Sequence, residues 1–103
     1  MEVYRDCFGK EVRLTEERRA HILEHPEMVG LVPEIGKVLA IPTLVRRSRT
    51  DPEARLFYEF YARTAVGGKW LCVVVKYPKE DGFVVTAYLT DQPKSGEELW
   101  PIK

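Results

Sequence analysis

Two histidines four residues apart are the side chains in this sequence best suited to proton transfer near neutral pH. His21 and His25 lie in the segment HILEH, and on a helix this spacing places both imidazoles on one face. Imidazole has an ordinary pKa of about 6.5, so it can donate or accept a proton under physiological conditions. We therefore expect an acid–base pair, in which His25 lies nearer the negative end of the helix dipole and acts as the acid, and His21 acts as the base.

Two other interpretations of the histidine pair stay open. Histidines near a helix end are often plain surface residues, or they hydrogen-bond to the last helical carbonyls. The spacing His-x-x-x-His also occurs in zinc sites. Here, however, the sequence has neither the glutamate of an HExxH motif nor a third ligand close by. The sequence therefore favours chemistry that needs no metal and no cofactor.

Basic side chains in the middle of the chain are candidates for binding an anion. Arg46, with Arg47 and Arg49, can bind phosphate through a planar guanidinium group. The same arginines would equally protect an edge strand by their charge. Lys76 closes a strongly apolar strand, where it either joins a polar face or extends to solvent. Both interpretations of each group stay open.

Hydroxyl groups near the end of the chain complete this set. Thr86 and Tyr88 are the polar residues of the segment VVTAY. Together with the histidines and the cations, they suit the cleavage of RNA. In that reaction a base removes the 2′-hydroxyl proton, cations stabilise the phosphorane and an acid protonates the leaving 5′-oxygen.

The charge of the chain is balanced overall but unevenly distributed. Lys and Arg number 16 and Asp and Glu also number 16, so the net charge is zero, which argues against strong non-specific binding of nucleic acid. Positions 43–76 hold seven basic and three acidic residues, a surplus of four. This local surplus permits one anion site without making the whole surface basic.

Two short helices are predicted in the first half. Thr15 is a good N-cap, and the two glutamates that follow it favour the positive end of a helix dipole. We expect this helix to extend to about Glu24 or His25, because Pro26 disfavours helical geometry in the residue before it. A second helix should begin at Pro33 and end before Pro42.

The rest of the chain predicts strands at residues 44–49, 55–63, 70–77 and 83–90, joined by short turns. Residues 2–7 and 11–14 form a further candidate hairpin. We therefore expect one α+β domain over residues 1–103, with two N-terminal helices packed on one face of a four-stranded antiparallel sheet. The apolar sets of the last two strands should face the helices, namely Leu71, Val73 and Val75 in one and Phe83, Val85, Ala87 and Leu89 in the other. The open face would then carry Lys76, Thr86 and Tyr88.

The sequence also predicts a cytoplasmic protein without disulfides. Its N-terminus lacks the apolar segment of a signal peptide. Its longest apolar run, residues 70–75, is far shorter than the roughly 20 residues of a membrane span. Cys7 and Cys72 are too few for a disulfide framework and suit small core positions.

The segments LTEERRAHILEHPEM, LFYEFY, KWLCVVVKY and FVVTAYLTD resemble the small phage-type nuclease-like domains of the barnase–EndoU–colicin–RelE (BECR) superfamily. The resemblance extends from about Val12 to Leu99. It implies N-terminal helices on a four-stranded antiparallel sheet and a metal-independent ribonuclease or toxin activity, with an antitoxin or immunity protein as a partner of such a toxin. It implies these catalytic residues: His21, His25, Arg46, Lys76, Thr86 and Tyr88. The glutamate base of barnase-like enzymes has no clear counterpart, and Glu59 is the sheet candidate.

Three functions follow, in descending order of support. The first is an RNA-cleaving domain, which removal of both histidines should inactivate. The second is a non-catalytic module that binds RNA or a protein on the open sheet face, with salt-sensitive binding that survives loss of the histidines. The third is an immunity-like or purely structural partner. The sequence does not determine the RNA substrate, whether activity is retained, whether an antitoxin exists, or the oligomeric state.

Overall fold

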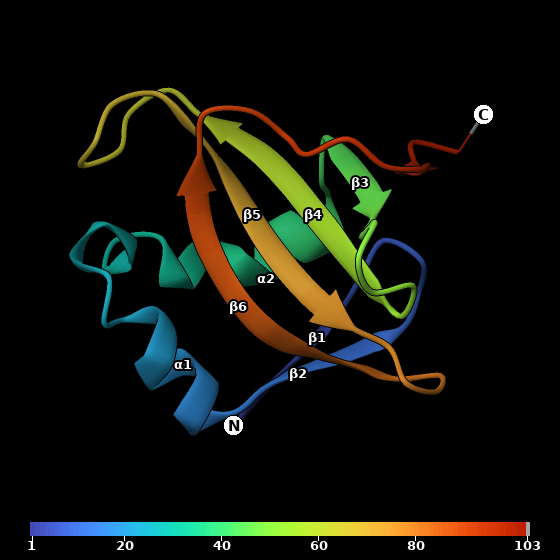
Figure 1. Cartoon of the computed structure of the whole chain (residues 1–103). Helices are drawn as coiled ribbons and strands as arrows, with labels where there is room; N and C mark the ends of the chain where they lie inside the picture. The colour runs from blue at the N-terminus through green and yellow to red at the C-terminus, as the bar shows by residue number, and fades with distance from the viewer. Residues whose placement is uncertain (103) are drawn as a thin grey trace.

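The computed structural model describes residues 1–102 of the chain (Figure 1). Two α-helices are present in this range, α1 (Glu16–Ile22) and α2 (Ile35–Ala40), with two short 3-10 helices, η1 (Pro26–Met28) and η2 (Val32–Glu34). The strands are β1 (Glu2–Arg5), β2 (Glu11–Leu14), β3 (Leu44–Arg47), β4 (Ala54–Tyr61), β5 (Lys69–Lys76), β6 (Gly82–Thr90) and β7 (Glu98–Trp100).

Among the described residues, seven strands form one mixed sheet in the order β1-β2-β6-β5-β4-β3-β7. β2 runs parallel to β6, through the pairs Val12–Gly82 and Arg13–Phe83, whereas the other described neighbours are antiparallel. The predicted fold, two helices on a four-stranded antiparallel sheet of the BECR type, is therefore wrong. The four expected strands are the consecutive neighbours β3 to β6, and the sheet extends beyond them on both sides.

Short terminal strands cause this difference. The predicted N-terminal hairpin forms, since β1 pairs antiparallel with β2, but its attachment to β6 was not expected. At the other edge β7 pairs with β3, so the strand that was one candidate for an exposed edge lies inside the sheet. Strands of three or four residues have little stability of their own. Their partners are decided by contacts between residues distant in the chain.

α1 begins as predicted and ends early. The Thr15 hydroxyl accepts a hydrogen bond from the backbone N–H of Arg18, 3.2 Å away, which caps the first turn. The helix stops at Ile22. His25 has an extended backbone (φ −96°, ψ 110°), as expected of a residue that precedes proline. The two histidines therefore do not share one helix, and the prediction that places both on one helical face is wrong.

The sheet separates two apolar clusters. On the side of the helices, which includes α2 behind the sheet in Figure 1, the main cluster joins helix residues such as Ile22, Ile35 and Val38 to alternate strand residues such as Phe57 and Val73. On the opposite side, called here the open face, a smaller cluster contains Leu44, Leu56, Tyr58 and Cys72. This division follows from the alternation of side chains along each strand.

A β-bulge in β6 changes which side chains reach the open face. Val74 pairs with Thr86 but Val75 pairs with Val84, which leaves Val85 as the extra residue. Val84 is fully buried in the helix-side cluster, whereas Val85 faces the open side beside Thr86. The prediction that Val85 faces the helices is therefore wrong, because simple alternation does not allow for an inserted residue.

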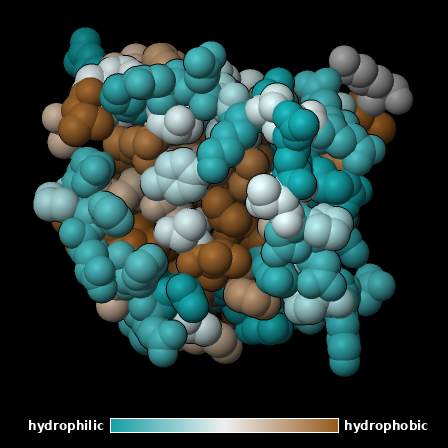
Figure 2. Space-filling view, in the orientation of Figure 1, coloured by the Kyte–Doolittle hydropathy of each residue, from teal (hydrophilic) through white to brown (hydrophobic). Residues whose placement is uncertain are grey.

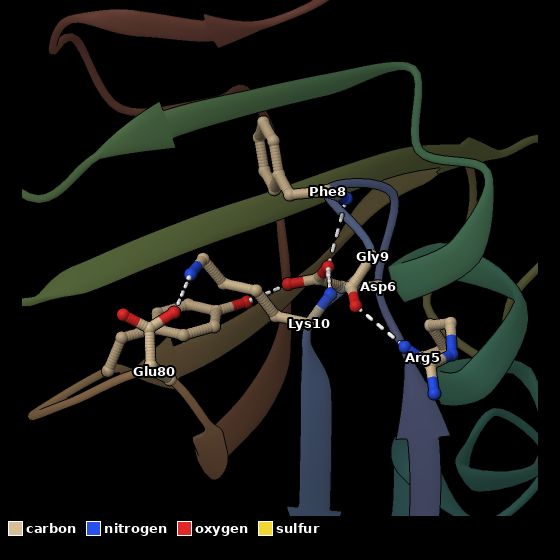
Figure 3. Close-up of polar contacts among 7 residues, drawn as sticks. Arg5, Asp6, Phe8, Gly9, Lys10 and Glu80 are labelled. Atoms are coloured by element: carbon tan, nitrogen blue, oxygen red, sulfur yellow. Dashed lines mark hydrogen bonds and ion pairs between the residues drawn. The ribbon is translucent and has the colours of Figure 1, made fainter.

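A buried carboxylate anchors the N-terminal hairpin to the end of β5. Asp6 is 5% exposed and accepts hydrogen bonds from the backbone N–H groups of Phe8 (2.9 Å) and Lys10 (2.8 Å) in the β1–β2 turn (Figure 3). Its other oxygen accepts from the Tyr77 hydroxyl at 2.5 Å. The guanidinium of Arg55 lies 4.7 Å from the centroids of both the Phe8 and Tyr77 rings. This arrangement explains how so short a hairpin is held.

Candidate functional site

The open face carries a pocket of about 720 Å³. Its floor consists of side chains from β4, β5 and β6, namely Ala54, Leu56, Val74, Val85, Thr86 and Tyr88. In Figure 2 apolar residues form the centre of this face and hydrophilic residues surround them. An apolar floor with polar groups at the rim is the usual form of a small-molecule or nucleotide site.

The β3–β4 loop forms one wall of the pocket and is held by its own hydrogen bonds. The Ser48 hydroxyl accepts from the backbone N–H groups of Thr50 (3.3 Å) and Asp51 (3.2 Å). The carbonyl of Asp51 accepts from the backbone N–H of Ala54 at 3.0 Å. These local bonds hold the loop in a turn, and they bring Arg49 and Asp51 to the rim.

Lys76 and Asp51 form an ion pair at this rim. The Lys76 ammonium lies 3.1 Å from one Asp51 oxygen and 3.8 Å from the Glu53 carboxylate. The hydrogen bond from Lys76, with that from the backbone N–H of Glu53, lowers the pKa of Asp51. The same hydrogen bond to Asp51, with the attraction of its charge, raises the pKa of Lys76. Both groups therefore remain charged near neutral pH.

A second wall comes from residues 91–97, which we call the crossing segment because it leads from β6 to β7 over the ends of β5 and β4 (Figure 1). The buried hydroxyl of Tyr58 accepts a hydrogen bond from the Lys94 backbone N–H at 3.1 Å. Gly96 lies so close to β3 that a Cβ atom there would be 2.5 Å from the Arg47 carbonyl oxygen. This close approach positions Lys94 and Ser95 over the pocket.

The basic segment of β3 is used mainly to hold the crossing segment. Arg46 donates to the Lys94 carbonyl at 2.8 Å, and Arg47 pairs with Glu97 at 2.9 Å. Arg49 donates to the Ser95 hydroxyl at 3.1 Å and also lines the pocket. Arg46 is therefore on the open face, beside Leu56, but its guanidinium has a structural partner.

Thr86 and Tyr88 both line the pocket, as does Lys76. The Lys94 ammonium lies 5.8 Å from the centroid of the Tyr88 ring. Burial, together with the adjacent Cys72 thiol, raises the pKa of Tyr88. Burial also raises the pKa of Cys72 to about 11. At neutral pH these groups are protonated and uncharged, so neither is prepared to act as a base or a nucleophile.

The histidines lie outside this site. α1 packs along β6 through Ile22, which belongs to the helix-side cluster, and both His21 and His25 are exposed. Among the described residues that line the pocket there is no histidine. Of the predicted catalytic residues, the structure thus brings together Lys76, Thr86 and Tyr88, with Arg46 nearby, and does not bring the two imidazoles to them.

Sequence reasoning missed the residues that come from loops. Asp51 precedes a proline in a segment whose pattern predicts only a turn, although an acidic residue beside a basic stretch is a usable signal. Lys94 and Ser95 lie in a segment with no strand or helix pattern. Nothing local indicates that this segment crosses the sheet.

The described range, residues 1–102, contains no cluster of three or more His, Cys, Asp or Glu side chains that could hold a metal ion. No helix within it is long and apolar enough to cross a membrane.

Comparisons with protein-family models, with curated proteins and with solved structures found no match for this chain.

Proposed function

We propose that this protein binds single-stranded RNA in the pocket of the open face. The observation that carries the proposal is the convergence of Arg49, Lys76 and Lys94 on one apolar-floored pocket. These cations come from three separate segments, the β3–β4 loop, the end of β5 and the crossing segment. A strand of RNA offers phosphates for the cations and bases for the floor.

The composition of the pocket favours RNA over a protein partner. Phosphate contacts are made by lysine, arginine and hydroxyl groups, and Thr50 and Thr86 add hydroxyls to the cations at the wall and floor. Bases stack on aromatic rings, and the half-exposed Tyr88 lies at the floor. Single strands fit an open sheet face because their bases are free to turn toward it.

The endoribonuclease activity and the BECR relationship stay predictions. The position of both histidines outside the pocket gives no support to a mechanism in which they act as acid and base. The toxin role and its antitoxin partner likewise stay predictions. The proposed function is therefore the binding of RNA, and its test must also follow whether the RNA is cut.

Fluorescence anisotropy with a labelled single-stranded RNA of about 10 nucleotides tests the proposal. We expect Lys76→Ala to weaken binding about tenfold, because a charge-assisted hydrogen bond to phosphate is lost. Arg49→Ala and Lys94→Ala should weaken it in the same direction. Each should also reduce the dependence of affinity on salt, by a slope of about 0.7 for each phosphate contact removed.

Lys37→Ala is the matched control, since Lys37 is an exposed lysine of α2 on the other side of the sheet. We expect this variant to bind RNA as the unchanged protein does. Equal weakening by Lys37→Ala and Lys76→Ala would show that binding is not located at the pocket, and the absence of any binding would refute the proposal. Electrophoresis of the same samples shows whether the RNA is cleaved.

A further inference from the structure

Asp51 is an acidic side chain in a pocket that otherwise attracts anions. Among the described residues that line the pocket, it is the one acid, beside Arg49, Lys76 and Lys94. A carboxylate at this position repels a polyanion unless it meets a hydrogen-bond donor of the ligand. The pocket therefore favours a ligand that presents an anion and a donor group side by side.

The hydrogen bonds of Asp51 leave part of its capacity unused. One oxygen accepts from the backbone N–H of Glu53 at 3.0 Å, and the other lies 3.1 Å from the Lys76 ammonium. An ionised carboxylate has about four lone-pair sites and no proton to donate. Since the Asp51 side chain is 36% exposed and lines the pocket, it can accept a further hydrogen bond from a ligand.

The short distance between the Asp51 carboxylate and the Lys76 ammonium restricts which hydrogen-bond donor of a ligand can reach Asp51. A phosphate bound by the Lys76 ammonium would lie next to the Asp51 carboxylate, because the two groups are 3.1 Å apart. In RNA the 2′-hydroxyl is on the carbon adjacent to the one that bears the 3′-phosphate. The amino groups of the bases are farther from the phosphate, and DNA lacks the 2′-hydroxyl.

We propose that Asp51 selects RNA over DNA by accepting a hydrogen bond from a ribose 2′-hydroxyl whose neighbouring 3′-phosphate is bound by Lys76. This inference rests on the proposed function and deepens it. It assigns a specificity role to a residue that would otherwise only weaken the binding of a polyanion.

Anisotropy with three labelled strands of one base sequence, made of RNA, DNA and 2′-O-methyl RNA, tests the assignment. We expect the unchanged protein to bind RNA about tenfold tighter than DNA, as for a hydrogen bond to a charged group. The 2′-O-methyl strand should bind like DNA, since it has no 2′ proton to donate. Asp51→Asn keeps an oxygen for the Glu53 N–H, so the loop should fold, and it should bring the RNA and DNA affinities close together.

Glu53→Gln is the matched control, because Glu53 also faces Lys76 but does not line the pocket; it should leave the ratio of RNA to DNA affinity unchanged. Circular dichroism of each variant confirms folding. Any one of three results would overturn the inference alone. These are equal binding of RNA and DNA by the unchanged protein, an RNA-to-DNA affinity ratio that Asp51→Asn leaves unchanged, and binding of the 2′-O-methyl strand as tight as that of RNA. Failure to bind any strand would overturn the proposed function and this inference with it.

Discussion

Two adjacent residues at the end of β5, Lys76 and Tyr77, contact two aspartates that differ in their burial. Tyr77 donates to Asp6, which is buried and has its oxygens occupied by donors of the protein. Lys76 pairs with Asp51, which is partly exposed at the rim of the open-face pocket. Neighbouring residues of an extended chain point to opposite sides, so one step along the backbone separates the two sites.

The difference shows how burial divides the roles of one residue type. A buried carboxylate must have all its hydrogen bonds within the protein, because an unpaired one costs free energy. Asp6 meets that demand and holds a hairpin. A partly exposed carboxylate keeps acceptor capacity that water fills until a ligand replaces it. We therefore interpret the Asp6 region as structural and the Asp51 region as part of the proposed binding site.

The sharpest test of this comparison is removal of the buried carboxylate. Asp6→Ala leaves the Tyr77 hydroxyl and two backbone N–H groups without their acceptor, so we expect the free energy of unfolding to fall by about 3 kcal/mol. Urea denaturation measures the change. Glu80→Ala, which removes a carboxylate that is 95% exposed and pairs with Lys10, is the control and should change stability little. Similar losses for the two variants would contradict the structural role of Asp6.

A smaller effect is expected at Tyr58, which belongs to the open-face cluster and contacts the crossing segment. Tyr58→Phe removes the hydroxyl that accepts from the Lys94 backbone N–H, and we expect a loss of about 1 kcal/mol in the free energy of unfolding. RNA affinity should also fall, because Lys94 and Ser95 are less firmly placed. Tyr77→Phe is the matched variant on the helix side of the sheet, and it should reduce stability without affecting RNA affinity. Unchanged RNA affinity in Tyr58→Phe would show that the pocket does not depend on the crossing segment.

The smallest effect is expected from the exposed histidines. Asp51 has a lowered pKa and is ionised above it, and Lys76 has a raised pKa and is protonated below it. Both therefore keep their charges from about pH 5 to pH 9, and RNA affinity should be constant through the range in which histidine titrates. A variant carrying both His21→Ala and His25→Ala should bind RNA as the unchanged protein does. A loss of affinity between about pH 6 and pH 7.5 that this variant abolishes would contradict the assignment.

Part of the pocket could be predicted because strand alternation is a local rule. The pattern of β5 places Lys76 opposite the side of Val73 and Val75, and the structure agrees. Thr86 and Tyr88 reach the open face as expected, although the bulge at Val85 changes the residues before them. Arg46 is one of the predicted site residues, but its hydrogen bond to the Lys94 carbonyl depends on a segment almost fifty positions away along the chain. No pattern among neighbouring residues in the sequence predicts such a contact.

The amino-acid sequence by itself determined the features that depend on near neighbours. The Thr15 cap, the end of α2 before Pro42, the β1–β2 hairpin and the four central strands all follow from backbone preferences and side-chain periodicity. Only the tertiary structure decided the parallel attachment of the hairpin, the addition of β7 and the meeting of Asp51, Lys76 and Lys94. These depend on hydrogen bonds and burial shared between distant segments, and their free energy exists only once the chain is folded.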